Sequence, residues 1–460
     1  MWTLLLIAIL FLTGCSSSDK PIGPNADPTQ VPPSTSDDTP APEQPDSTPT
    51  PPDDSMPEPD TPMRRKWIAA GYTYQRPDGN RMALGTGSLP AGTEIEIPLS
   101  GSPQWVVAAP IPEGSIWAVA LSDGRVQAFK VTTTQTESLT ITPDILLPGT
   151  PPLLVVDDQG QPALANPTDA EASTFTNPAL LTPEGRIAYI DNSGDLVIRD
   201  GDVDFHLPIN ALPDARILMD EEERILLLTN PTSRYGHGVL GDDLEAAGIA
   251  LIETRPTPQV VLHIDIPAPA VVEGLSPIWT DLTGDGRREI LVTLSDEEQG
   301  ARIAAFDETG RRIATGPAIG QGYRWRHQIA VAPFGPLGEI EIVDILTPHI
   351  GGTVEFYLLI DDALDIATRI PGYTSHRIGS RNLDMAVAGD FDGDGQIELL
   401  LPNQALTQLG AVRHTPTGAR IVWTLPLSQR ISTNLAAVTL ADDRLALGLG
   451  YGQTLHLWLP

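Results

Sequence analysis

Two nine-residue stretches, Asp281-Leu-Thr-Gly-Asp-Gly-Arg-Arg-Glu289 and Asp390-Phe-Asp-Gly-Asp-Gly-Gln-Ile-Glu398, carry alternating oxygen side chains around a glycine. Each runs directly into an apolar segment of the kind that forms a strand. A hard cation such as Ca²⁺ takes about six to eight oxygen ligands, and a turn with a carboxylate at every second position aims several of them inward. The stretches therefore predict cation-binding turns that lead into strands.

The spacing of the carboxylates separates these turns from an EF-hand loop. An EF-hand has a bidentate Glu at its twelfth position, and the corresponding residues here are Val292 and Leu401. The closing carboxylate comes at the ninth position instead, as Glu289 and Glu398. A metal-free polar hairpin turn is the alternative for each stretch.

A third copy of the turn indicates a repeat. Residues 333–341 align without gaps on 390–398 and keep the aromatic, glycine, isoleucine and glutamate positions, but all three early Asp positions are replaced. This copy keeps the turn and has lost the metal ligands. The closing residues Glu289, Glu341 and Glu398 follow one another at intervals of 52 and 57 residues. Self-similarity at such a period predicts a blade-type or solenoid array.

Over about residues 277–427 these motifs resemble the FG-GAP/VCBS repeat family, whose integrin-alpha-like members are β-propellers with calcium in the turn between the first two strands of a blade. The resemblance implies Ca²⁺ as the bound ion. The implied ligands are Asp281, Thr283, Asp285, Glu289, Asp390, Asp392, Asp394 and Glu398, with the backbone carbonyls of Arg287 and Gln396. Thr283 stands where the family has Asp or Asn, so we expect the first site to be weaker.

The N-terminus predicts a signal peptide over residues 1–14. This uncharged apolar run is shorter than the roughly 20 residues that a membrane-spanning helix needs. The end of this run and the next residue read Leu12-Thr-Gly-Cys15, which resembles the bacterial lipobox, in which the cysteine is acylated and becomes the mature N-terminus. We therefore expect a lipoprotein of the bacterial cell envelope, anchored to a membrane through Cys15 and exposed outside the cytoplasm.

Residues 15–63 are expected to form a disordered tether after the lipidated cysteine. Prolines occupy 14 of the 48 positions from 16 to 63, with many Ser, Thr and Asp and almost no large apolar residue. Such a segment cannot bury enough surface to offset the entropy of ordering. Cys15 is the single cysteine of the chain, so an intrachain disulfide is excluded.

The charge of the chain disfavours nucleic acids as partners. The chain has 60 acidic and 28 basic residues, and most of this excess lies in residues 64–460. An acidic surface repels phosphates.

Residues 64–460 are expected to form one all-β domain, a seven-bladed β-propeller, with six or eight blades as alternatives. Short apolar runs alternate with Gly, Asp, Asn and Pro turns from residue 104 onward. Inner strands are expected near 105, 155 to 178, 215, 277, 329, 385 and 435. The stretches 153–156 and 179–181 compete for the second of these positions. Residues from about 67 to 100 should complete the last blade and close the ring.

Alternation of strand direction places the calcium turns on one face of the propeller and the longest loops on the other. Arginine, histidine and aromatic residues gather in those long loops, which is unexpected in so acidic a chain. They are Arg234, Tyr235, His237, Tyr323, Arg324, Trp325, Arg326, His327, His349, Tyr373, His376, Arg377 and Arg381. This face is predicted to bind an anionic ligand, such as an acidic glycan or a carboxylate-bearing protein segment.

Two other interpretations of this face remain. The Arg and His side chains could pair with nearby acids and fasten loops, and the histidines could form a transition-metal site, although no paired spacing supports one.

The sequence favours a binding function over catalysis. It contains none of the nucleophile-elbow, HExxH, P-loop or dinucleotide-binding motifs. Propellers do host glycosidases and polysaccharide lyases, so an enzyme that acts on polysaccharide is one alternative. A platform for the assembly of envelope proteins is another.

Overall fold

The computed structural model describes residues 66–460, which form strands and turns without a helix. The predicted signal peptide, Cys15 and the tether lie outside these described residues. Within the described part, no helix is long and apolar enough to cross a membrane.

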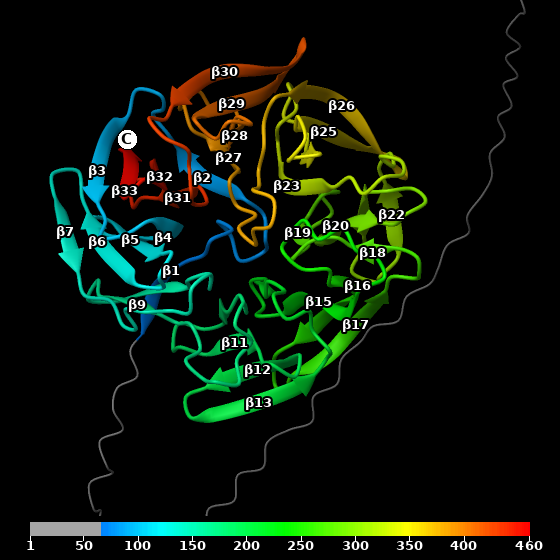
Figure 1. The fold of residues 1–460 in the computed structure, drawn as a ribbon, viewed down its shortest axis with the longest axis horizontal. Helices are drawn as coiled ribbons and strands as arrows, with labels where there is room; N and C mark the ends of the chain where they lie inside the picture. The colour runs from blue at the N-terminus through cyan, green and yellow to red at the C-terminus, as the bar shows by residue number, and fades with distance from the viewer. Residues whose placement is uncertain (1–65) are drawn as a thin grey trace, which may run out of the picture. The chain divides into compact units, whose positions relative to one another are not determined.

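The strands form consecutive antiparallel groups, each starting close to the centre of the structure (Figure 1). The first two groups are β4 (Pro103–Ile111), β5 (Gly114–Leu121), β6 (Val126–Val131), β7 (Thr136–Leu139), and β8 (Leu154–Asp157), β9 (Pro162–Leu164) with β1 (Trp67–Gly71). The third and fourth are β10 (Ala179–Leu180), β11 (Ile187–Ile190), β12 (Asp195–Asp200), β13 (Val203–Pro208), and β14 (Leu218–Met219), β15 (Ile225–Thr232), β16 (Glu245–Glu253), β17 (Gln259–Asp265).

The remaining strands continue this pattern around the ring. They are β18 (Val271–Val272), β19 (Ile278–Thr280), β20 (Glu289–Ser295), β21 (Arg302–Phe306), β22 (Arg312–Thr315); β23 (Arg326–Ala332), β24 (Glu341–Leu346), β25 (Thr353–Ile360), β26 (Ala363–Pro371); β27 (Val387–Asp390), β28 (Glu398–Pro402), β29 (Gln408–Thr415), β30 (Gly418–Pro426) with β2 (Met82–Thr86); and β31 (Ala436–Thr439), β32 (Leu445–Tyr451), β33 (Thr454–Leu459) with β3 (Thr93–Pro98).

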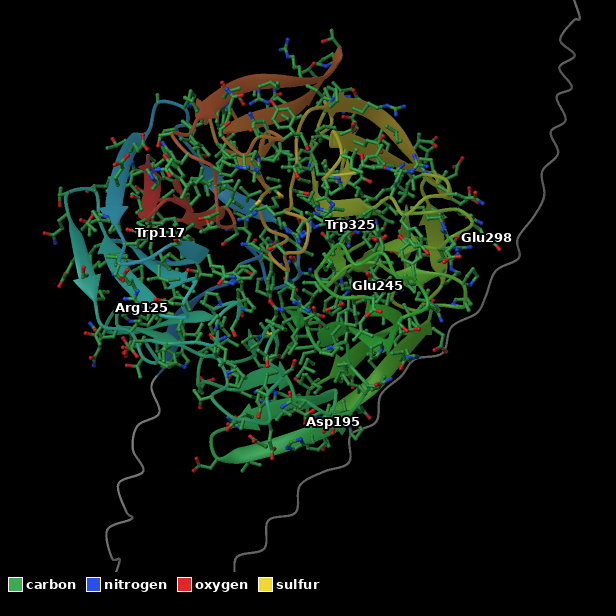
Figure 2. The ribbon with its side chains drawn as sticks, viewed as in Figure 1. Trp117, Arg125, Asp195, Glu245, Glu298 and Trp325 are labelled. Carbon is green, nitrogen blue, oxygen red and sulfur yellow. The ribbon has the colours of Figure 1, made fainter. Side chains whose placement is uncertain are left out.

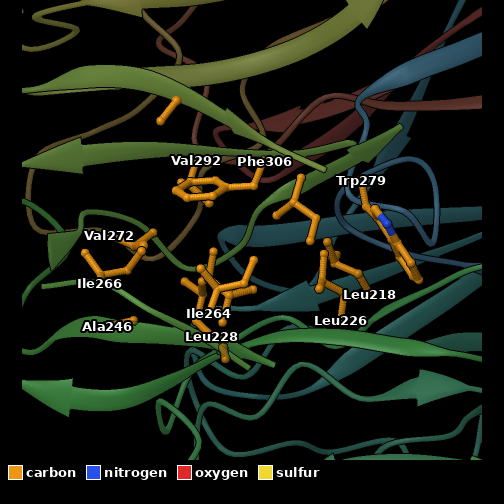
Figure 3. Packing of buried hydrophobic residues seen from close by; sticks show 14 of the residues in the cluster. Leu218, Leu226, Leu228, Ala246, Ile264, Ile266, Val272, Trp279, Val292 and Phe306 are labelled. Carbon is orange, nitrogen blue, oxygen red and sulfur yellow. The ribbon is translucent and has the colours of Figure 1, made fainter. Parts of the chain in front are cut away.

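Apolar layers between neighbouring groups form the core. The strand that follows the inner strand of a group is buried on both faces, as in β20, which follows β19 and has every residue buried. One layer joins the group β14–β17 to the group β18–β22 through Leu226, Leu228, Trp279 and Val292 (Figure 3). Radial sheets with apolar layers between them confirm the predicted all-β propeller class.

The pairing of the strands is compatible with two counts of the blades. The strands make five separate sheets and one thirteen-stranded sheet. The thirteen-stranded sheet consists of three groups, joined by a single bridge between β16 and β18 and another between β22 and β26. The stretches that competed for one inner strand lie in different sheets, as β8 and β10. Counted as a blade, the three-stranded sheet β1–β8–β9 makes the ring eight-bladed; otherwise it has the predicted seven.

The first and last parts of the chain close the ring together. Strand β3 pairs along its whole length with the C-terminal strand β33, from Thr93 opposite Leu459 to Pro98 opposite Thr454. The predicted closure is therefore found, but only residues 93–98 of the expected segment carry it. Strand β1 pairs with β8 instead, and β2 pairs in parallel with β27.

Residues 72–81, between β1 and β2, run through the centre of the ring (Figure 1, blue). They bond to the inner strands, or to residues just before them, in five groups. The pairs are Thr73 with Asn434, Tyr74 with Ile217, Gln75 with Ala437, Asp78 with Trp279, Asn80 with Val331, and Arg81 with Asp384. Asp384 also binds Arg216, and all three side chains of this ion cluster are buried. We call residues 72–81 the axial segment.

Candidate functional site

The connections between strands lie on two opposite faces, as the sequence predicted. The turn 281–288 joins β19 to β20 and the turn 391–397 joins β27 to β28, and we call their side the turn face. The loops 233–244, 316–325, 347–352 and 372–386 lie at the other strand ends and make the loop face. In Figure 2, Trp325 and Glu245 of this face lie toward the centre, whereas Asp195 and Glu298 lie at the rim.

The first acidic turn is built by carboxylates that accept backbone N–H groups. Gly284 and Gly286 donate to the two oxygens of Asp281, at 2.6 and 2.9 Å. Leu282 donates to Oε2 of Glu289 at 2.8 Å. Burial raises the pKa of Glu289, and the negative charge of the turn adds to this effect. The closing glutamate therefore anchors the turn by accepting a hydrogen bond from its backbone.

The second turn repeats this pattern and brings its acids closer together. Gly393 and Gly395 donate to the two oxygens of Asp390, at 2.8 and 3.2 Å, and Phe391 donates to Glu398 at 2.9 Å. One oxygen each of Asp390, Asp392 and Glu398 lie within 4.8 Å of one another. These oxygens form a group that could hold a metal ion.

The two turns differ in the residue opposite their closing glutamate. In the second turn this residue is Arg413, whose guanidinium donates to Asp394 at 2.7 Å, to Asp392 at 3.2 Å and to Glu398. In the first turn the same register places Asp307 opposite Glu289. The first turn thus offers oxygens without a competing cation, whereas in the second a guanidinium already lies among the acids.

On the loop face, the aromatic and imidazole residues form two adjoining clusters. In one, the ring of Tyr235 lies 5.2 Å from that of Tyr323 and 6.0 Å from that of His237. In the other, the rings of His327, His376 and His349 lie 4.7, 5.3 and 6.1 Å from the indole of Trp325. Trp325 connects the clusters because its indole N–H donates to the carbonyl of Glu273 at 3.1 Å.

Two buried carboxyl groups lie behind these clusters. Glu273 contacts Nδ1 of His237 and the hydroxyl of Ser295, and its side chain is fully buried. Glu245 lies beside it and accepts a bond from the backbone of Gly274 at 3.2 Å. Burial raises the pKa of both carboxyl groups, and the charge of Glu273 raises that of Glu245 further.

Most of the predicted arginines hold loops in place. Arg234 donates to the carbonyls of Ile266 and Ala270, and Arg324 to those of Ile319 and Gln321. Arg326 is buried in its own sheet against Asp344 and Glu355. Arg381 pairs with Asp214 and Asp242. Tyr373 is buried against Gly410.

Arg377 differs from these arginines because it is exposed at the edge of a pocket of about 370 Å³. The pocket is lined by Gln104, Trp105, Phe175, Arg377, Arg381 and Asn382. Oε1 of Gln104 is buried there without a hydrogen-bond partner. Arg381 lies over the ring of Phe175, at 4.2 Å, with its charge balanced by Asp214 and Asp242. The pocket thus combines one unbalanced positive charge with amide groups and aromatic walls.

Three participants were missed by reasoning from the sequence. Arg413 and Glu273 lie on strands or strand ends without any local motif, and only the cross-strand register brings them to their sites. Gln104 reaches the pocket from a distant part of the chain. The one available signal was a buried-type strand that carried an isolated charge, as β29 does at Arg413.

Comparison with protein-family models and with curated proteins finds no match, so the resemblance to FG-GAP/VCBS repeats stays a prediction. Among solved structures, the chain is similar to a europium-containing methanol dehydrogenase, with 10% identity over 84% of this chain and 90% of that chain and a TM-score of 0.51. Weaker likenesses are the WD40 domain of coronin from Toxoplasma gondii (9% identity, 86% of each chain, TM-score 0.36) and the Dos1 propeller (9% identity, 82% and 94%, TM-score 0.34). These likenesses concern the fold alone, and the arrangement of the strands in radial sheets (Figure 1) identifies the chain as a β-propeller.

Proposed function

We propose that this β-propeller is a binding module whose loop face holds an anionic ligand, an acidic glycan or a carboxylate-bearing protein segment. The observation that carries the proposal is the pocket at Arg377. Among residues 66–460 its guanidinium forms no ion pair with an acid, in a chain of net charge −32, and it borders a pocket with an unpaired amide oxygen. Arg offers a planar fork for carboxylate or sulfate, and the amide and aromatic groups suit sugar hydroxyls and rings.

A binding assay with acidic polysaccharide tests this proposal. Polygalacturonate and a neutral glucan of the same length would be titrated at low and at physiological salt. We expect retention of the acidic polymer alone, weakened by salt because exposed charges are screened beyond about 8 Å at 0.15 M. Arg377→Ala should weaken binding about fivefold, since one exposed ionic contact contributes about 1 kcal/mol.

The matched control is Arg420→Ala, which removes an exposed arginine from the outer strand β30. It should leave binding unchanged. Equal loss in both variants, or equal retention of the neutral polymer, would contradict a specific anionic site. The same assay scores product release, because new chain ends during incubation would favour the alternative of a polysaccharide-degrading enzyme. A single protein captured in place of the polymer would favour an assembly platform.

We also propose that Ca²⁺ stabilises the propeller at the two acidic turns. Oxygen donors from Asp281, Asp285 and Glu289 suit a hard cation. The ion would supply positive charge that removes the repulsion among these acids. Binding to the folded chain alone adds about 2.7 kcal/mol at a hundredfold excess over Kd. A chelator should therefore lower the melting temperature, and an unchanged melting temperature would remove calcium from the proposal.

The remaining part of the proposal places the propeller outside the cytoplasm of a bacterium, bound to the envelope membrane through lipidated Cys15. It rests on the residues before and at that cysteine. The test is the distribution of the full chain between membrane and soluble fractions. Cys15→Ser should move it to the soluble fraction, and retention in the membrane would contradict the anchor.

A further inference from the structure

Two histidines of the loop face point ring nitrogens at each other. Nε2 of His349 lies 2.5 Å from Nδ1 of His376. His376 is buried and His349 is half-buried. The indole of Trp325 packs against both rings, so their positions are fixed by packing as well as by this contact.

The tautomer of His376 follows from its other nitrogen. Nε2 of His376 contacts the backbone carbonyl of Ser380. A carbonyl oxygen can only accept, so Nε2 carries the hydrogen and Nδ1 of the neutral ring presents a lone pair toward His349. This backbone carbonyl therefore orients the ring of His376 and leaves its free nitrogen available as a ligand.

His237 has the same arrangement with a carboxylate. Its Nδ1 contacts the buried carboxyl group of Glu273. Histidines that ligate metals almost always donate their second ring N–H to a carboxylate or a backbone carbonyl. Such an acceptor, the carbonyl of Ser380, is present behind His376.

We propose that His349 and His376 bind one divalent transition-metal ion, with Zn²⁺ the first candidate. Imidazole suits Zn²⁺, Cu²⁺ and Ni²⁺, whereas the oxygen-rich turns suit Ca²⁺. Two imidazoles on a tetrahedral Zn²⁺ have nitrogens about 3.3 Å apart, given bond lengths of about 2.0–2.1 Å. The half-buried ring of His349 can move outward by the required distance of under about 1 Å.

The protonation states support this assignment. Burial lowers the pKa of His349 to about 4 and that of His376 to about 3. Both rings are therefore neutral near pH 7, which is the form that binds metal. Two clusters of acidic residues in the described part contain a histidine, Glu94–Glu96–His456 and Asp191–Asp195–His206, and each holds a single imidazole.

Metal titration of the full chain tests the proposal, with excess Ca²⁺ present to fill the acidic turns. We expect one equivalent of Co²⁺ to give a visible absorption band typical of imidazole ligation, and one equivalent of Zn²⁺ to displace it. His349→Ala and His376→Ala should each abolish the band.

The control is His206→Gln, which removes the imidazole of an Asp-rich group on β13 and should leave Co²⁺ binding unchanged. Uptake that survives His349→Ala, or that is lost in His206→Gln alone, would overturn the proposal. Absence of Co²⁺ and Zn²⁺ uptake would reduce the histidine pair to a hydrogen-bonded pair. If His376→Ala does not fold, His349→Ala decides, because His349 is only half-buried. The proposal does not depend on the anionic ligand, and either can fail alone.

Discussion

Replacement of Arg413 by methionine, which keeps most of the apolar stem and removes the charge, should make the second acidic turn more dependent on calcium. The guanidinium lies among Asp392, Asp394 and Glu398 in the second acidic turn. Without it, three carboxylates face one another with no cation between them. A bound Ca²⁺ could take over its role, because the donors are all oxygens.

The burial of the groups sets the size of the effect. The side chain of Glu398 is fully buried and that of Arg413 is 9% exposed, whereas those of Asp392 and Asp394 are 20% and 49% exposed. Breaking a buried ion pair costs about 3–5 kcal/mol, and the two exposed pairs add little to this. For roughly 400 folded residues, with about 2.1 cal/mol/K of unfolding entropy each, this is a fall of about 4–6 °C in melting temperature.

The assay is thermal unfolding of the full chain, with chelator and with excess Ca²⁺. The fall should appear in full with chelator and shrink by at least half with Ca²⁺, because the ion no longer competes with a guanidinium. Arg444→Met, which breaks an exposed pair with Asp442, is the control and should cost under about 1 kcal/mol in either buffer. An equal loss with and without Ca²⁺ would refute the reasoning, since Arg413 would then act only as a structural partner.

Three further predictions concern stability, each measured by denaturant unfolding. Asp384→Asn leaves Arg81 and Arg216 buried without a counter-charge and should cost about 3–5 kcal/mol; a cost under about 1 kcal/mol would show that the ion cluster of the axial segment is dispensable. Gly448→Ala places a Cβ 2.2 Å from the ring of Trp117 and should cost about 1–3 kcal/mol, with Gly236→Ala, at a site with open space, as the control. Burial raises the pKa of Asp344 to about 7, so between about pH 4 and pH 7 the folded chain keeps a proton that the unfolded chain releases. Rising pH should then lower the free energy of unfolding in this window by at most about 1.4 kcal/mol per unit, and Asp344→Asn should flatten the dependence; an unchanged slope would contradict this pKa.

The repeat and the closure of the ring could be predicted because local patterns carry them. The acidic turns have a fixed spacing, and β3 alternates Thr, Ile and Ile with charged residues, as an outer strand does. The axial segment could not be predicted in this way. Residues 72–81 contain Tyr, Arg, Asp, Asn and Gly, a composition typical of a loop. Their hydrogen-bond partners lie far away in the sequence, 143 positions away for Tyr74 and 362 for Gln75.

The candidate sites show the same division. The turn residues Asp281 and Asp390 were found from spacing, whereas Arg413 becomes part of the second turn only through its pairing across the strands. On the loop face, composition identified the histidines but not their orientation. That orientation depends on Glu273 and on the carbonyl of Ser380, and a carbonyl has no signature in a sequence.

The axial segment has a mechanical consequence. A pull on the chain at Trp67 first loads β1, which pairs with β8, and then reaches residues 72–81 within a few positions. These residues are bonded to five groups of strands, so the load would then be shared among those groups. At the opposite terminus, β33 is bonded along its length to β3, which lies only a short stretch of chain beyond the same residues. Detaching either terminus therefore strains the centre of the ring.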